Sequence, residues 1–327
     1  MSGGRVERLA ILGLGLLGGS VALAARRAGV AGTIVAAGRR SAPLEAARAR
    51  GVVDEIGPPR EVARGADLVV LAAPVGAMPQ LVEDVAPVLG TGTLVSDVGS
   101  VKGGLAESLP GLLPAGVHFV GSHPMAGSHL RGVEHARADL FDGAPCVVCP
   151  TPGVPAAAVE RLAGFWCSLG ARVQVREPHR HDLEVAWVSH LPHILAFAFA
   201  RALEGAPRDA GALAGSGFRD FTRIARSDPG LWAEIVAANG KAIAGPLARA
   251  IECLGELARA LEAGDADQVE SAFARGRAEL ARFGAATTDS AAASAEAAEK
   301  PHPEARSGNP AAARTAATQG ANDIVHD

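Results

Sequence analysis

The sequence predicts an α/β protein in which a parallel-sheet domain is followed by an all-helical domain and a tail without stable structure. Three observations predict this. Short apolar runs alternate with helical stretches to about residue 177, helical spacing alone continues to about 284, and large aliphatic residues then almost disappear. A chain of 327 residues is long enough for two domains. The expected divisions are 1–178, 179–284 and 285–327.

Apolar runs of strand length mark the predicted sheet, and they alternate with helical stretches. Such alternation is typical of parallel strands joined by crossover helices. The runs are Leu9–Leu12, Thr33–Ala37, Leu68–Ala73, Thr93–Asp97, His118–Val120 and Ala144–Cys149. A helix over Val159–Ser168 and a run over Arg172–Arg176 are expected to extend the same sheet.

Helical spacing replaces the strands after Pro178. Apolar residues recur three and four apart from about Leu183, and again over Trp232–Leu261, where they are too many for one face to hide within a small domain. A helical homodimer interface is therefore expected. From Ala285 to Asp327 the composition cannot offset the entropy of ordering, so disorder is expected, with marginal Ala-rich helix as the alternative.

Composition narrows the classes of partner. The 31 basic and 35 acidic residues give a net charge of −4 without a basic stripe, which argues against nucleic acid. Four cysteines do not make a disulfide framework, and no signal-peptide pattern precedes the first strand, so a cytoplasmic protein is expected. The apolar run 186–200 contains His190 and Pro192 and is shorter than the ~20 residues of a membrane span. A buried helix is expected there, and no membrane contact.

A glycine-rich turn follows the first predicted strand and opens an apolar helix. Its sequence is Gly13-Leu14-Gly15-Leu16-Leu17-Gly18, which is the GxGxxG pattern of a Rossmann dinucleotide-binding domain in its required context. Gly13 permits the tight turn, Gly15 leaves room for the pyrophosphate, and Gly18 lets helix and strand approach. The first backbone amides of the helix would hold the phosphates. The alternative is a glycine turn kept for packing alone.

The residues after the second predicted strand favour NADP over NAD. About 20 residues beyond the glycines, an NAD enzyme normally has an acid that binds the adenosine ribose. This chain has Gly38 there, followed by Arg39, Arg40 and Ser41, which offer two cations and a hydroxyl to a 2′-phosphate. NAD stays possible, because the arginines could be ordinary solvated charges and a missing acid also permits use of both cofactors.

Four further segments carry polar groups that packing alone would not require: Ser96–Lys102, Gly121–Ser128, Ser189–His193 and Gly217–Pro229. In order and spacing they resemble the prephenate and arogenate (cyclohexadienyl) dehydrogenases of tyrosine biosynthesis, from about Leu9 to Phe283. The resemblance implies oxidative decarboxylation of prephenate or arogenate, with hydride transfer to NAD(P), giving 4-hydroxyphenylpyruvate or tyrosine. Such a reaction needs a base at the substrate hydroxyl, cations for the carboxylates and a fixed hydride geometry.

By this resemblance, four residues form the catalytic set. His123, in His123-Pro124-Met125-Ala126-Gly127, matches the family's catalytic histidine, and neutral imidazole is a suitable base near neutral pH. Ser100 matches the serine that bonds both this histidine and the substrate hydroxyl, although it could also cap a helix over Val101–Leu109. Arg223 matches the arginine that binds a substrate carboxylate. His190 matches a histidine beside the side-chain carboxylate, with a core histidine as the alternative.

Several other polar residues are assigned to structure. Arg219 and Arg226 are expected to be solvated or interface charges, and His193 a packing residue. Cys146 and Cys149 lie in a predicted strand, where residues three apart point to opposite faces, so no metal or redox site is expected. Where the family often has an acid after its HPxxG segment, this chain has Ser128 followed by His129, and the choice between prephenate and arogenate stays open.

Two other functions compete with this assignment. A β-hydroxyacid type of dehydrogenase would need a lysine base on the long helix, but Lys241 is the only lysine of the helical domain and its surroundings do not resemble that motif. A non-catalytic, cofactor-sensing dimer would not need Ser100, His123 and Arg223 together. We therefore expect a dimeric NAD(P)-dependent dehydrogenase of a small-molecule substrate.

Overall fold

The structure is a computed structural model that describes residues 5–127 and 130–299, with side chains up to residue 284. Ser128 and His129, which stand where the family often has an acid after its HPxxG segment, lie outside the described residues. The strands are β1 Val6–Leu12, β2 Ala31–Ala37, β3 Glu55–Ile56, β4 Leu68–Leu71, β5 Leu94–Asp97, β6 His118–Pro124, β7 Pro145–Pro150 and β8 Arg172–Val175. The first helices are α1 Leu16–Ala28, α2 Ser41–Ala49, α3 Pro59–Ala63, α4 Met78–Val85, α5 Gly103–Ser108 and α6 Ala156–Ser168. The later ones are α7 Pro178–Val185, α8 Leu191–Ala202, α9 Ser216–Thr222, α10 Pro229–Ala238, α11 Gly240–Glu262 and α12 Ala266–Glu299.

The strands form one sheet in the order β3-β2-β1-β4-β5-β6-β7-β8. Every pair from β3 to β6 is parallel, as the sequence predicts, but β7 runs antiparallel to β6. The expectation of a parallel strand over Ala144–Cys149 is therefore wrong. In the described part of the connection between β6 and β7 the one regular element is the short turn η4 (Val133–His135), whereas a parallel return usually runs through a crossover helix.

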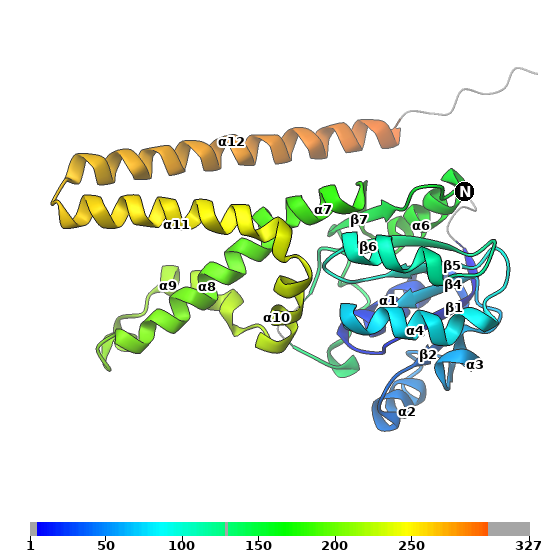
Figure 1. The fold of residues 1–327 in the computed structure, drawn as a ribbon. Coiled ribbons are helices and arrows are strands. Elements are labelled where there is room, and N and C mark those ends of the chain that lie inside the picture. Colours follow the sequence, from blue (N-terminus) through cyan, green and yellow to red (C-terminus); the bar gives the residue numbers. More distant parts are fainter. Residues whose placement is uncertain (1–4, 128–129, 300–327) are drawn as a thin grey trace, which may run out of the picture. The chain divides into compact units, whose positions relative to one another are not determined.

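The core lies on both faces of the sheet, where helices cover it (Figure 1). Along β1, Leu9 and Ile11 belong to one apolar cluster and Ala10 and Leu12 to the other, because successive strand residues point to opposite faces. Strands buried on both faces read as continuous apolar runs, and these runs made the sheet predictable. Only the two-residue β3 was not predicted.

The carboxyl ends of the parallel strands carry the polar motifs. The strand order reverses between β1 and β4, where open α/β sheets bind their ligands. The glycine turn follows β1, Ser100 follows β5 and His123 ends β6, so these residues share one edge of the sheet. The chain divides into two compact units, one ending at Cys253 and one beginning at Leu254. Helices α7–α10 belong to the first unit together with the sheet.

Helices α7 and α8 are joined by one turn of π-helix, η5 (Ala186–His190). Pro192, in the first turn of α8, has no amide to donate to the carbonyl four residues earlier, which explains the wider turn. The stretch from Pro178 to Gly205 is the one helical segment among the described residues with the length and composition of a membrane span. The sequence predicted a buried helix here, and the structure buries only one face of it. Ala186 and His190 are buried, whereas Trp187 and Val188 are exposed.

The second unit contains the end of α11 and the helix α12, which run antiparallel (Figure 1). The backbone of α12 continues past Gly284 to Glu299, so the Ala-rich continuation is helical there rather than unstructured. Alanine has the highest helix propensity, which accounts for this continuation. Residues 300–327 of the expected tail lie outside the described residues.

Candidate active site

The glycine turn after β1 has the geometry of a dinucleotide site. Gly13 has φ +113°, and a Cβ there would lie 2.4 Å from the carbonyl oxygen of Ala72 at the end of β4. A Cβ at Gly18 would lie 2.1 Å from the carbonyl oxygen of Gly13, so only glycine permits this approach of helix and strand. At Gly15, the N-cap of α1, a Cβ would meet nothing within 4 Å. The turn thus leaves open space before the amides at the start of α1, which is what a pyrophosphate requires.

The end of β2 presents cations to solvent. Gly38, Arg39, Arg40 and Ser41 are all exposed, and α2 begins at Ser41 with no side-chain cap on its first amides. Within the described chain, neither arginine makes an ion pair. A phosphate here would find two guanidinium groups and a helix N-terminus.

A buried ion pair lies at the end of β5. Lys102 is 1% exposed and its Nζ pairs with Oδ2 of Asp97, which is completely buried. Asp97 also accepts hydrogen bonds from the amides of Gly99 at 2.8 Å and Ser122 at 3.2 Å. The pair therefore ties the β5–α5 connection to β6, one residue before His123.

Ser100 lies in that β5–α5 connection and is partly buried, but it does not cap the following helix. α5 begins at Gly103 with Lys102 as its N-cap, and the expected helix from Val101 is two residues too long at its start. The carboxylate of Asp182, on α7, accepts from the amides of Lys102 and Gly103, each at 2.8 Å. Asp182, about eighty residues away in the chain, thus accepts the hydrogen bonds of helix amides that a neighbouring cap residue would otherwise accept.

His123 is the second-to-last residue of β6 and is 7% exposed. Its Nδ1 lies 2.8 Å from Nε2 of His181, and Nδ1 of His181 lies 2.8 Å from Oδ1 of Asp182. α7 positions His181 and Asp182 because Glu177 caps its first turn, accepting from the amides of His179 and Arg180. The three residues form a continuous hydrogen-bonded chain from α7 to the end of β6.

The direction of this chain follows from which atoms can accept. A carboxylate only accepts, so Nδ1 of His181 donates to Asp182, and when this imidazole carries a single proton its Nε2 is an acceptor. Nδ1 of His123 must then donate to His181, which leaves Nε2 of His123 as its basic nitrogen. The arrangement selects one tautomer of His123 and makes it a proton acceptor.

The electrostatics agree with these proton positions. Burial raises the pKa of Asp182, but hydrogen bonds from His181 and from the amides of Lys102 and Gly103 outweigh it and hold that pKa below its usual value. Burial, with smaller effects of His181, Lys102 and His190, holds the pKa of His123 well below its usual value. Asp182 is therefore ionised and His123 neutral near neutral pH.

His190, on the π-turn η5, is fully buried and close enough to His123 to act on its pKa. Its Nδ1 lies 3.0 Å from Nδ2 of Asn239, and its Nε2 has no hydrogen-bond partner among the described residues. Burial lowers its pKa to about 4. His193 instead stacks on Trp232 at 3.6 Å between ring centroids and bonds the carbonyl of Ser189, in accord with a packing role.

Arg223 begins η8 (Arg223–Arg226), the short turn after α9. Its side chain is exposed, and its charge lowers the pKa of His193, after the larger effects of burial and of the Ser189 carbonyl. Within the described residues no ion pair involves it. Arg219 bonds the carbonyl of Ala214, and both it and Arg226 are exposed, as expected of solvated charges.

Cys146 and Cys149 are free thiols, both buried in β7. Burial raises the pKa of each, that of Cys149 to about 12, so neither is a thiolate at neutral pH. The described residues contain no cluster of three or more histidine, cysteine or acidic side chains suited to a metal.

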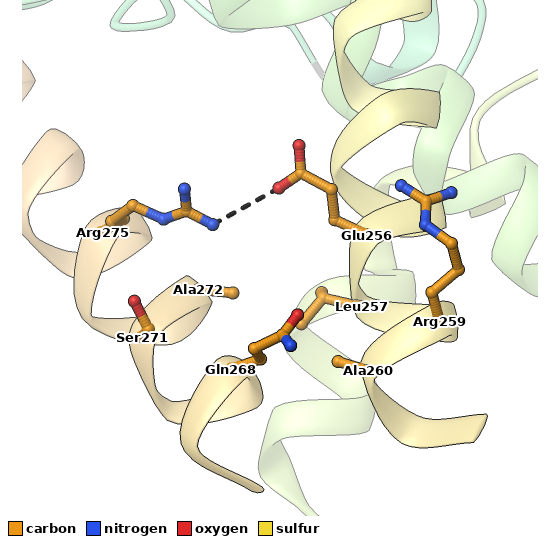
Figure 2. Close-up of a pocket in the computed structure, with 8 residues that line it drawn as sticks. All are labelled: Glu256, Leu257, Arg259, Ala260, Gln268, Ser271, Ala272 and Arg275. Atoms are coloured by element: carbon orange, nitrogen blue, oxygen red, sulfur yellow. Dashed lines mark hydrogen bonds and ion pairs between the residues drawn. The ribbon is translucent and has the colours of Figure 1, made fainter. Parts of the chain in front are cut away.

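A pocket of about 340 Å³ lies in the second unit between the end of α11 and α12 (Figure 2). Glu256 and Arg275 point toward each other across it and pair at 3.3 Å. None of the residues predicted to do chemistry lines this pocket. We therefore place the candidate active site at the carboxyl edge of the sheet and not here.

Four residues that organise the site received no role from the sequence, although the first of them lies in the polar segment Ser96–Lys102. They are Lys102, His181, Asp182 and Asn239. A His-Asp pair just before the helical pattern that starts at about Leu183 was an available signal for the second and third. Asn239 gave no signal, because only folding brings it to His190.

Comparisons with known proteins agree with this geometry. Residues 21–175 match the family model described as prephenate dehydrogenase, nucleotide-binding domain, and residues 177–275 match prephenate dehydrogenase, dimerization domain. The chain belongs to the prephenate dehydrogenase family. The glycine turn lies before the matched region, so its geometry is independent support for a dinucleotide site. Members of this family carry out NAD(P)-linked oxidative decarboxylation in tyrosine biosynthesis, and this is the function of the chain.

Individual relatives cover most of the chain. Cyclohexadienyl dehydrogenase of Zymomonas mobilis is 33% identical over 273 residues, which are 82% of this chain and 92% of the relative. Prephenate dehydrogenase of Lactococcus lactis is 31% identical over 83% of this chain and 76% of the relative. The crystal structure of prephenate dehydrogenase from Aquifex aeolicus, in complex with hydroxyphenyl propionate and NAD+, has a TM-score of 0.77 and 28% identity, covering 85% of this chain and 98% of that one.

Proposed function

We propose that this prephenate dehydrogenase family member oxidises prephenate or arogenate with His123 as the base. The chain Asp182–His181–His123 carries the proposal, because it leaves Nε2 of a buried, neutral imidazole as the proton acceptor. Nε2 takes the proton of the substrate 4-hydroxyl as the C4 hydride leaves. The bond from the ring to the carboxylate breaks, CO2 departs, and its electron pair completes the aromatic ring. A nicotinamide cofactor held at the glycine turn would supply the hydride acceptor.

Other side chains bind and orient the substrate. Ser100 follows β5, the strand that pairs with β6, and there its hydroxyl would bond both His123 and the substrate hydroxyl. Arg223 offers a planar guanidinium to one carboxylate, and Nε2 of His190 offers a buried donor to the other. Prephenate and arogenate share both carboxylates, so this set accommodates either substrate.

The residues at the end of β2, where the adenosine ribose would lie, favour NADP as the cofactor. Gly13, Leu14, Gly15, Leu16, Leu17 and Gly18 form the turn that would hold the pyrophosphate. Arg39, Arg40 and Ser41 are exposed at the N-terminus of α2, where a 2′-phosphate would lie, and Gly38 supplies no acid to repel it. NAD remains the second candidate.

The assembly we infer is a cytoplasmic homodimer through the helical domain. Large apolar side chains are exposed on the second unit: Leu254, Leu261, Phe273, Leu280 and Phe283. A second copy would bury them, in keeping with the dimerization domain that residues 177–275 match. Sedimentation of the wild-type chain and of Phe273→Glu tests this, with a shift of the variant toward monomer expected.

One steady-state experiment tests the function. The protein is mixed with NADP or NAD and with prephenate or arogenate, and the near-ultraviolet absorbance of reduced nicotinamide is followed while the aromatic product is identified by chromatography. We expect turnover with one molecule of CO2 per hydride transferred, and higher kcat/KM with NADP. Cofactor binding without turnover of either substrate would instead support the cofactor-sensing dimer.

A further inference from the structure

Asn239 is a buried polar residue between α10 and α11 that the reaction itself does not use. Its side chain is 4% exposed, and the residue is the C-cap of α10. Nδ2 lies 2.8 Å from the backbone carbonyl of Asp182 and 3.0 Å from Nδ1 of His190. One amide group thus joins α7, which carries the His123 relay, to the π-turn that carries His190.

The orientation of this amide is determined by its partners. The carbonyl oxygen of Asp182 can only accept, so the NH2 group of Asn239, and not its oxygen, must face it. The second hydrogen of the same NH2 group then points to Nδ1 of His190. That nitrogen accepts, and a neutral His190 must carry its proton on Nε2.

The donor created in this way lacks a partner. Nε2 of His190 is buried and makes no hydrogen bond within the described residues. An unpaired buried donor costs stability, so its presence indicates that an acceptor arrives with a ligand. The nearby basic nitrogen of His123 explains why a neutral donor suits this position, because a buried cation there would make His123 a weaker base.

We propose that Asn239 is a positioning residue that locks His190 in its Nε2–H tautomer, so that His190 donates a hydrogen bond to the side-chain carboxylate of the substrate. The inference rests on the proposed function for the identity of that carboxylate. The tautomer itself does not depend on it. Asn239 and Asp182 together set opposite roles for the two Nε2 atoms, acceptor on His123 and donor on His190.

Charged and titratable groups surround His190 on several elements. Asp182 on α7 raises its pKa, His181 and His193 lower it, and burial dominates all three. His123 on β6 is the other titratable neighbour, and the ring of Trp232 on α10 lies edge-on at 6.0 Å. Replacing Asn239 by aspartate adds an acceptor beside Nδ1, which moves the proton of neutral His190 to Nδ1 and raises its pKa.

Nitrogen NMR of histidine-labelled protein tests the tautomer without any turnover. In the wild-type enzyme we expect His190 to carry its proton on Nε2, and in Asn239→Asp on Nδ1. Addition of hydroxyphenyl propionate, an aromatic carboxylate, should shift the Nε2–H signal of the wild type. A wild-type His190 protonated on Nδ1 would overturn the inference, whatever the enzyme's activity.

Kinetics test the role of the donor. Asn239→Asp should raise the KM for substrate at least about tenfold at neutral pH, with the KM for NADP unchanged, and this KM should fall as pH falls and His190 becomes protonated. His190→Gln keeps an amide donor near Nε2, whereas His190→Asn places it near Nδ1, so the Gln variant should bind substrate more tightly. Thr93→Val, which removes a buried hydrogen bond to Ala66 at the opposite end of β5, controls for general destabilisation.

The possible failures are distinguishable. If the NMR result stands but the wild-type enzyme turns over neither substrate, the proposed function fails and the tautomer assignment survives. If turnover occurs and Asn239→Asp leaves the substrate KM and its pH profile unchanged, the positioning role is wrong. Should Asn239→Asp fail to fold, the wild-type NMR spectrum still decides the tautomer of His190, and the two His190 variants decide its role as a donor.

Discussion

Nε2 of His181 lies 2.8 Å from Nδ1 of His123, although the two residues are 58 positions apart in the chain. Asp182, the neighbour of His181, accepts a hydrogen bond from the other ring nitrogen of His181. It also caps α5 by accepting from the amides of Lys102 and Gly103. A single carboxylate therefore joins the orientation of the base to the start of the helix that follows Ser100. Displacing it should disturb catalysis more than cofactor binding.

Asp182→Asn should lower kcat by about 10- to 100-fold, because an amide cannot accept from His181 and from both amides at once, and His123 loses its preferred tautomer. The KM for NADP should change little. Asp84→Asn, which removes an exposed pair with Arg60, is the matched control. An unchanged kcat in Asp182→Asn would show that the relay does not orient the base.

His123→Asn should lower kcat by at least about 100-fold, the usual contribution of a general base, while NADP still binds. Asparagine can still donate near the position of Nδ1 but has no basic nitrogen. Stopped-flow measurement of hydride transfer and fluorescence titration of NADP separate the two effects. The assignment is wrong if the variant keeps more than roughly a tenth of the wild-type kcat.

Arg223→Lys should raise the KM for substrate much more than it alters folding, because lysine keeps the charge but loses the two-pronged geometry. Thermal unfolding provides the control, and Arg226→Lys is the matched variant on the same turn. A substrate KM equal to that of the wild type would move the carboxylate contact elsewhere, with Arg219 the next candidate.

The double variant Arg39→Ala, Arg40→Ala should weaken NADP by about 2 kcal/mol or more and leave NAD little changed. Gly38→Asp should shift preference further toward NAD, and a Cβ there makes only ordinary contact with Leu44 at 3.5 Å. The measurement is kcat/KM for each cofactor at fixed ionic strength, since salt screens exposed arginines. Equal losses for both cofactors would mean that the arginines do not contact the 2′-phosphate.

Stability should fall as pH falls below neutrality. The unfolded chain binds a proton at His190 near pH 6.5, but the folded protein does so only near a pKa of about 4, so protons favour unfolding between these values. For His190 alone the free energy of unfolding should be about 2 kcal/mol lower near pH 5 than near pH 7.5. The Asp182 carboxylate loses its contribution only at still lower pH, because its pKa is depressed. Urea unfolding should show a smaller pH difference in His190→Gln, and an equal one would exclude His190 as the cause.

The sequence by itself determined the parallel part of the sheet and the glycine turn after β1, whereas the roles of His123, Ser100, His190 and Arg223 came from the family resemblance and stay predictions. Strands buried on both faces must be apolar, and a turn that brings helix and strand together needs Gly13 and Gly18. These constraints act between residues that are close in sequence, so a short stretch of sequence is enough to predict them.

Tertiary structure alone decided the direction of β7, the cap of α5 and the hydrogen-bond partners of the buried histidines. β7 is antiparallel to β6, and the described part of their connection contains no crossover α-helix that would return the chain for parallel pairing. The carboxylate of Asp182 on α7, and not the hydroxyl of Ser100, accepts from the amides at the start of α5. Which nitrogen of His123 or His190 carries a proton depends on His181 and Asn239, which are distant in sequence. A hydrogen bond assigns donor and acceptor only when both partners are in place, and only the folded chain brings these partners together.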